Sequence, residues 1–106
     1  AMPKYLILYR SKMAPGDQMS TMSPGEMQAE MDKWNAWGQS AGEALVDFGE
    51  PTKPTSDDDP GPAGWVGGYS VLQADDEASL QAVLTDHPHK PFGSIEVHEI
   101  LPMPGQ

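Results

Sequence analysis

The chain lacks cysteine and long apolar runs, and each absence removes a class of protein. With no cysteine among its 106 residues, it has no disulfide, no thiol nucleophile and no cysteine ligand for zinc. No apolar run approaches the roughly 20 residues of a membrane-spanning helix, and the first residues lack the apolar stretch of a signal peptide. We therefore expect a cytoplasmic protein that is not inserted in a membrane.

Basic residues are also scarce: six Lys and Arg stand against sixteen Asp and Glu, for a formal net charge of -10. Proteins that bind DNA or RNA usually present a basic stripe that neutralises phosphates. Here the basic residues are scattered along the chain: Lys4, Arg10, Lys12, Lys33, Lys53 and Lys90. Nucleic acid and anionic membrane surfaces are therefore not expected as partners.

Length and composition predict one domain over residues 1–106. Hydrophobic residues make up 38% of the chain, and three Trp, three Tyr and two Phe favour a packed core despite 11 Gly and 11 Pro. We expect residues 1–3 and 102–106 to be tails, with Ala1 an added residue before Met2.

Short apolar segments predict four strands, at 4–10, 45–48, 65–74 and 94–101. In the first, Tyr5, Ile7 and Tyr9 share one face, whereas Leu6 and Leu8 share the other. Apolar residues on both faces indicate a central strand that is covered on both sides.

A helix beginning at Ser23 and ending near Gly42 has clear terminal signals. Ser23 suits the N-cap, Pro24 suits the first helical position, and Glu26 completes a capping box. One stripe at helical spacing consists of Met27, Met31, Trp34, Gly38 and Ala41. We expect most of this stripe to be core, with Trp37 at its flank.

Two segments are predicted as loops, 11–23 and 50–64. Met13, Met19 and Met22 make the first adaptable, so it either covers the sheet edge or forms a mobile lid over a ligand. The pair Gly67-Gly68, inside a predicted strand, indicates a β-bulge or a close backbone approach.

The order of elements is β-α-β-β-α-β once a second helix, capped by Asp75 or Asp76 and ended by Pro88, is included. This is the order of the α+β ferredoxin-like fold, an antiparallel sheet with both helices on one face. Nothing in the chain is left to cover the other face. We therefore expect a homodimer that joins two sheet faces.

The run from Asp58 to Tyr69 (DDPGPAGWVGGY) resembles the Asp-Pro-Gly-x-Ala-Gly-aromatic-x-Gly segment of the YCII-related (DGPF-type) family. Residues 45–49 (LVDFG), 87–89 (HPH) and 95–99 (IEVHE) are similar to that family too, so the likeness covers 4–105. The resemblance implies a dimeric α/β-barrel of two ferredoxin-like protomers. Relatives that share this fold are small-molecule lyases, isomerases, dehalogenases and cofactor-free oxygenases. Some family members pair a His in the first helix with an Asp, and this chain has Met31 at that helix position.

The three histidines are candidates for proton transfer or metal binding. His98, beside Glu96 on the polar face of the last strand, is either a tuned acid or base or a solvated residue. His87 and His89 flank Pro88, where they either bind a metal or serve a structural role at the helix exit. No third ligand is specified, and Asp57–Asp59 lacks the spacing of a calcium loop. We expect neither a metal nor a cofactor.

Asp47 lies inside a short apolar strand, where a carboxylate is unusual. Burial would raise its pKa and suit it to general acid or base catalysis, whereas an edge strand would let it reach water. The hydroxyls of Tyr5, Tyr9 and Tyr69 could share a cavity with it, or the rings could simply pack in the core.

We predict that the protein binds a small molecule in a cleft between the sheet and the helices. It is either a cofactor-independent enzyme of lyase or isomerase type, or a non-catalytic ligand-binding or accessory dimer. In the enzyme, Asp47 with His98 or His89 would move protons. The candidate ligand-binding residues are Tyr5, Tyr9, Met31, Trp34 and Tyr69.

Overall fold

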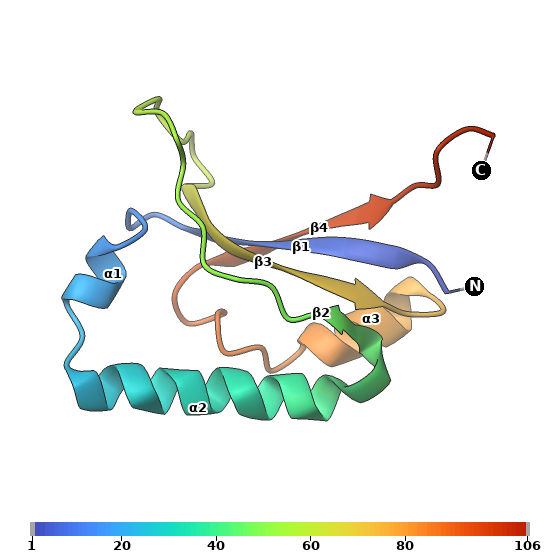
Figure 1. The fold of residues 1–106 in the computed structure, drawn as a ribbon, viewed down its shortest axis with the longest axis horizontal. Helices are drawn as coiled ribbons and strands as arrows, with labels where there is room; N and C mark the ends of the chain where they lie inside the picture. The colour runs from blue at the N-terminus through green and yellow to red at the C-terminus, as the bar shows by residue number, and fades with distance from the viewer. Residues whose placement is uncertain (1, 106) are drawn as a thin grey trace.

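The computed structural model describes residues 2–105 (Figure 1), so Ala1 and Gln106, at the ends of the two expected tails, lie outside the described residues. The elements in chain order are β1 (Lys4–Ser11), α1 (Asp17–Ser20), α2 (Pro24–Ala41), the 3-10 turn η1 (Gly42–Ala44), β2 (Leu45–Asp47), β3 (Trp65–Gln73), α3 (Glu77–Leu84) and β4 (Ser94–Ile100). The predicted order of strands and longer helices is confirmed. The one-turn helix α1 was not predicted, because a single turn is too short to show a helical period.

The strands form one antiparallel sheet in the order β2-β3-β1-β4, with β2 and β4 at its edges. Helices α2 and α3 lie on the same side of this sheet (Figure 1). The architecture is α+β and compatible with a ferredoxin-like fold. None of the helices in residues 2–105 combines the length and the apolar composition needed to cross a bilayer.

The central strand β1 divides its side chains between two environments. Tyr5, Ile7 and Tyr9 face the helices and are buried, whereas Leu6 and Leu8 on the opposite face are half-buried. We call these the covered face and the open face of the sheet. The predicted alternation along β1 is confirmed.

The pair Gly67-Gly68 forms the predicted bulge. Tyr9 pairs with Gly68, but the next residue, Arg10, pairs with Val66, which leaves Gly67 as the extra residue. The segment between β2 and β3 approaches closely here, since Pro51 forms an isolated bridge with Gly68.

The predicted N-terminus of α2 is confirmed. The Ser23 hydroxyl accepts the backbone N–H of Glu26, and the Glu26 carboxylate accepts the backbone N–H of Ser23, each at 3.2 Å. This reciprocal pair satisfies two donors that the helix itself leaves free. Helix α3 is capped by Asp76, whose carboxylate accepts the N–H of Ser79 at 2.8 Å.

The predicted inner stripe of α2 was partly wrong. Trp37, placed at the flank, is 7% exposed, whereas Met31, placed in the stripe, is 50% exposed. The helix is rotated so that Trp37 enters the core, where its indole N–H donates to the carbonyl of Val83 at 3.0 Å. Burying an indole with a satisfied N–H removes more apolar area from water than burying a flexible methionine.

The last strand is one residue shorter than predicted. The predicted strand included Leu101, but this residue is 72% exposed. The final pair of the β1–β4 ladder is Lys4 with Ile100, so Leu101 lies beyond the reach of the neighbouring strand.

Candidate functional site

Two histidines are buried between the sheet and α2. His87 is 2% exposed and His89 is 8% exposed. The ring centroid of His87 lies 4.3 Å from that of Trp37, 4.7 Å from Trp34 and 4.8 Å from Tyr9. The two histidines of the segment that follows α3 are therefore part of the core, as the structural alternative for them requires.

The hydrogen bonds of His87 define its tautomer. Its Nδ1 accepts the backbone N–H of His89 at 2.9 Å, so the proton of the neutral ring is on Nε2. Nε2 lies 3.0 Å from the Tyr9 hydroxyl and donates to it. Tyr9 in turn donates to the Ser70 hydroxyl at 2.7 Å, and Ser70 donates to the carbonyl of Phe48 at 2.7 Å. Every donor in this chain has an acceptor, which is the condition for burying it without a large penalty.

Burial keeps both His87 and Tyr9 uncharged. Desolvation, with smaller contributions from the charges of His89 and Lys90, lowers the pKa of His87 to about 4. Desolvation also raises the pKa of Tyr9 to about 12, although its hydrogen bond to Ser70 acts in the opposite direction. Neither group titrates near pH 7, so the arrangement suits structural support better than proton transfer at neutral pH.

His89 attaches the segment 87–93 to the sheet. Its Nε2 lies 2.8 Å from the carbonyl oxygen of Arg10 on β1, so Nε2 carries the proton and donates it. Gly93 closes the segment, and its N–H donates to the His89 carbonyl at 3.2 Å. A Cβ atom at Gly93 would lie 1.9 Å from the Arg10 carbonyl oxygen, so only glycine allows this approach.

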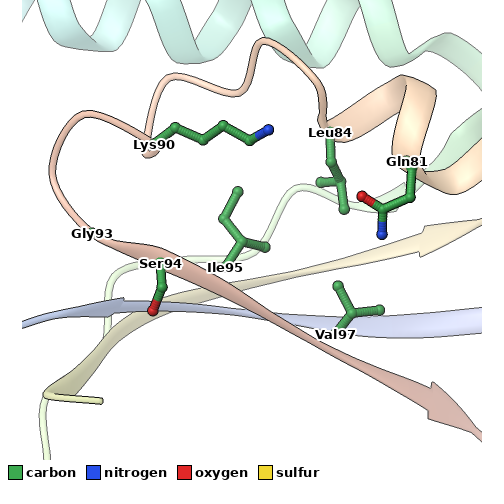
Figure 2. Close-up of a pocket in the computed structure, with 7 residues that line it drawn as sticks. All are labelled: Gln81, Leu84, Lys90, Gly93, Ser94, Ile95 and Val97. Carbon is green, nitrogen blue, oxygen red and sulfur yellow. The ribbon is translucent and has the colours of Figure 1, made fainter. Parts of the chain in front are cut away.

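A cleft of about 430 Å³ lies beside this segment, between α3 and β4 (Figure 2). We call it the β4–α3 cleft. It is lined by Gln81, Leu84, Lys90, Gly93, Ser94, Ile95 and Val97. In Figure 2, Leu84, Ile95 and Val97 point into it, Gln81 reaches in from the helix, and Lys90 extends over Ile95 toward Leu84. Its volume is within the range of small-molecule sites.

A second hollow, of about 280 Å³, lies between Arg10, the loop residues 52–60 and the start of β3. Arg10 is already engaged there, because its guanidinium donates to the Gly64 carbonyl at 2.8 Å and to Glu96 at 2.9 Å. The Arg10 guanidinium is therefore already occupied by protein acceptors.

Asp47 lies on the edge strand β2 and is exposed. Its carboxylate accepts the N–H of Gly49 at 2.8 Å in a local turn. The sequence left open whether this carboxylate is buried or reaches water from an edge strand, and the structure shows the second arrangement. The short strand was correctly predicted, but its position in the sheet was not visible in the sequence.

His98 lies on the open face with its predicted neighbour. Its Nε2 is 2.6 Å from Glu96, which also binds Arg10, and the His98 side chain is 54% exposed. The hydrogen bond from His98, together with Arg10, holds the pKa of Glu96 below its usual value. His89 is in the interior and Asp47 at the other edge of the sheet, so the structure does not bring the three predicted catalytic side chains together.

The five predicted ligand-binding residues are also divided. Tyr5 and Tyr9 are buried on the covered face, and Trp34 packs edge-on against Tyr9 with ring centroids 4.9 Å apart. Tyr69 pairs with Leu8 and shares its open face, so its hydroxyl does not share a cavity with the other two. Met31 is half-exposed on the outer side of α2.

Sequence reasoning named His87 as a metal ligand or a structural residue at the helix exit without its neighbours in space, and it did not single out Lys90. It placed His87 at a helix exit, although the aromatic residues nearest to it in space come from β1 and α2, far away in sequence. Lys90 was counted only as one of six scattered basic residues. One signal for this region was available in the sequence: two histidines and a lysine lie within four residues, 87–90, just before a strand.

His87 and His89 were also candidates for metal binding, which would need at least one further ligand close to them. Within residues 2–105, no three His, Asp or Glu side chains are grouped closely enough to hold a metal ion. His87 also has both ring nitrogens engaged by protein groups.

Comparison with known proteins adds no assignment, because no family model matches the chain and no curated protein matches its sequence.

Proposed function

We propose that this chain is a cytoplasmic, homodimeric protein that binds a small molecule in the β4–α3 cleft. The observation that carries the proposal is the cleft of about 430 Å³, with apolar side chains from both walls and polar groups at its rim. Small-molecule sites place polar groups beside apolar contacts, and the lining of this cleft mixes the two. The resemblance to the YCII-related family supports a small ligand and a dimer.

The site has a rigid support. The segment that carries Lys90 and Gly93 is attached to β1 by His89 and to the aromatic core by His87. A binding site held by buried hydrogen bonds loses less conformational entropy when a ligand enters.

A cleft-filling substitution tests the location of the ligand. Gln81 is exposed on α3 and reaches into the cleft, so Gln81→Trp would fill the space without disturbing the core. Gln39→Trp, on an exposed position of α2, is the matched control. In a methyl-NMR screen of small aromatic and aliphatic molecules, we expect shifts at Leu84, Ile95 and Val97 in the wild type and in Gln39→Trp. Retention of these shifts in Gln81→Trp would place the ligand elsewhere.

The open face supports the homodimer. Leu6, Leu8, Tyr69 and Val71 lie on it and are half-buried, whereas both longer helices lie on the other side. A second copy would remove this apolar surface from water. In sedimentation experiments at micromolar concentration, we expect twice the 11.4 kDa mass of one chain. Leu8→Glu should give a folded monomer, while Met31→Glu on α2 stays dimeric; a monomeric wild type would contradict the dimer.

A cofactor-independent lyase or isomerase is the second candidate, and Glu30 favours it. One oxygen of this carboxylate is buried without a hydrogen-bond partner in residues 2–105, and the other accepts from Lys33 at 3.1 Å. This oxygen is a candidate proton acceptor, but Glu30 lies on α2 and lines neither the β4–α3 cleft nor the second hollow, so such an enzyme would bind its substrate outside both. If the protein is such an enzyme, a bound molecule will exchange C–H protons for deuterium in D₂O, and Glu30→Gln will abolish the exchange. A binding protein will show no exchange.

A further inference from the structure

Lys90 is the cation of the cleft. Arg10 is paired with Glu96 and Lys33 with Glu30, but within residues 2–105 no carboxylate lies within ion-pair distance of the Lys90 ammonium. In Figure 2 its side chain runs above Ile95 toward Leu84. The ammonium group is thus placed above an apolar floor, with hydrogen-bonding capacity that the protein does not use.

The backbone of Lys90 is held in place by the buried histidines. Its N–H donates to the carbonyl of His87 at 3.2 Å, and the next turn closes through Phe92 N–H to the carbonyl of His89 at 2.9 Å. Both histidines are in turn bonded to β1 through Tyr9 and Arg10. The root of the Lys90 side chain is therefore fixed relative to the floor of the cleft.

From this placement we propose, resting on the proposed function, that the β4–α3 cleft selects a small organic anion: a carboxylate or similar group on an apolar body. The ammonium of Lys90 binds the anionic group, the amide of Gln81 can donate a second hydrogen bond, and Leu84, Ile95 and Val97 contact the apolar body.

The charge of the whole chain limits the class of anion. With a formal net charge of -10, the protein repels anions at long range, and a single lysine cannot overcome this repulsion for a polyanion. A singly charged ligand gains enough from the apolar floor to bind in spite of the field. Nucleotides and other polyphosphates are therefore outside the proposed class.

The test compares 2-naphthoate with 2-naphthamide, which has the same apolar body without the charge. Titrations of both are followed through the methyl signals of Leu84, Ile95 and Val97. We expect 2-naphthoate to bind up to about fivefold more tightly than 2-naphthamide, the upper end of what one exposed ion pair contributes. Added NaCl should weaken only the carboxylate.

Lys90→Gln and Lys12→Gln carry the same change in net charge, so they separate the local contact from the long-range field. We expect Lys90→Gln to raise the Kd of 2-naphthoate by up to about fivefold and leave that of 2-naphthamide unchanged, whereas Lys12→Gln changes neither by more than about twofold. Equal affinity for the two probes, or equal weakening by the two variants, would overturn the anion selectivity while the cleft stands as a site. If neither probe shifts the cleft methyls, the proposed ligand site and the anion selectivity both fail.

Discussion

Each face of the sheet carries a histidine in a series of hydrogen-bonded side chains, and the two series differ in almost every other respect. On the covered face, His87, Tyr9 and Ser70 form a buried, neutral series that ends at a main-chain carbonyl. On the open face, His98 and Arg10 bind the same carboxylate, that of Glu96, within reach of water.

The difference shows how the layer above a strand determines what a histidine does. Under α2, water is excluded, so the neutral ring is favoured and each nitrogen has one defined partner. On the open face the interactions are ionic and screened, and they contribute little to stability. The hydrogen bonds of His87, Tyr9 and Ser70 on the covered face support the fold and the cleft. We expect that the ion pairs of Glu96 on the open face can be removed with little loss of stability.

The largest expected effect is on the covered face. Trp37→Ala should lower the free energy of unfolding by about 3–5 kcal/mol, because a buried indole and its hydrogen bond to Val83 are both lost. Met31→Ala on the outer side of the same helix should cost less than about 0.5–1 kcal/mol. Urea unfolding monitored by circular dichroism measures both. Similar losses for the two variants would contradict the observed rotation of α2.

Acidification should lower the stability of the fold, because His87 is neutral in the folded protein. Its pKa falls from 6.5 in the unfolded chain to about 4 in the folded protein. Between these values the unfolded state binds more protons, so stability rises with pH across this window and is lost as pH falls from about 6.5 toward 4. The loss should be on the order of 2–3 kcal/mol.

Substitutions of His87 and His98 test whether His87 causes that pH dependence. His87→Gln should be less stable at pH 7 but should lack the extra slope between pH 4 and 6.5, whereas His98→Gln should keep it. Urea midpoints at several pH values report the slope. An unchanged slope in His87→Gln would mean that another group causes it.

Two tyrosines allow the covered and open faces to be compared with one chemical change. Tyr9→Phe removes the hydroxyl between His87 and Ser70 and leaves a buried N–H unsatisfied, so it should cost about 1–3 kcal/mol. Tyr69→Phe on the open face should cost less than about 0.5 kcal/mol. Thermal unfolding of both variants at pH 7 is sufficient, and a neutral Tyr9→Phe would show that the buried chain adds no stability.

The smallest effects are expected at the exposed acid and histidine. His98→Gln and Asp47→Asn should each change the free energy of unfolding by about 0.5 kcal/mol or less, since both side chains are exposed. Denaturant titration measures this change. A loss above about 2 kcal/mol in either variant would show that the residue is buried in the assembled protein, as His98 would be if the interface of the proposed homodimer extends over it.

Most of the fold could be predicted because its signals are local. The capping box at Ser23 and Glu26 depends on residues three positions apart, and the faces of β1 follow from strict alternation. The bulge at Gly67 was indicated by a glycine pair inside a strand. The inner face of α2 was less predictable, because Met31 and Trp37 fit stripes that differ by a small rotation of the helix.

The candidate site was predictable only in part, because its members come from distant parts of the chain. His87 and Tyr9 are 78 residues apart in sequence and bonded in space, and Lys90 borders a cleft whose other wall is β4. Asp47 had the right residue type for catalysis, but the edge position of β2 exposes it.

The sequence by itself determined the element order, the helix caps, the alternation of β1 and the shortage of positive charge, since these depend on composition and on neighbours within a few positions. Only the tertiary structure decided that His87 is neutral and that Lys90 has no carboxylate partner within residues 2–105. The physical reason is that burial and pairing depend on which elements lie against each other, and packing brings together groups whose distance along the chain carries no signal.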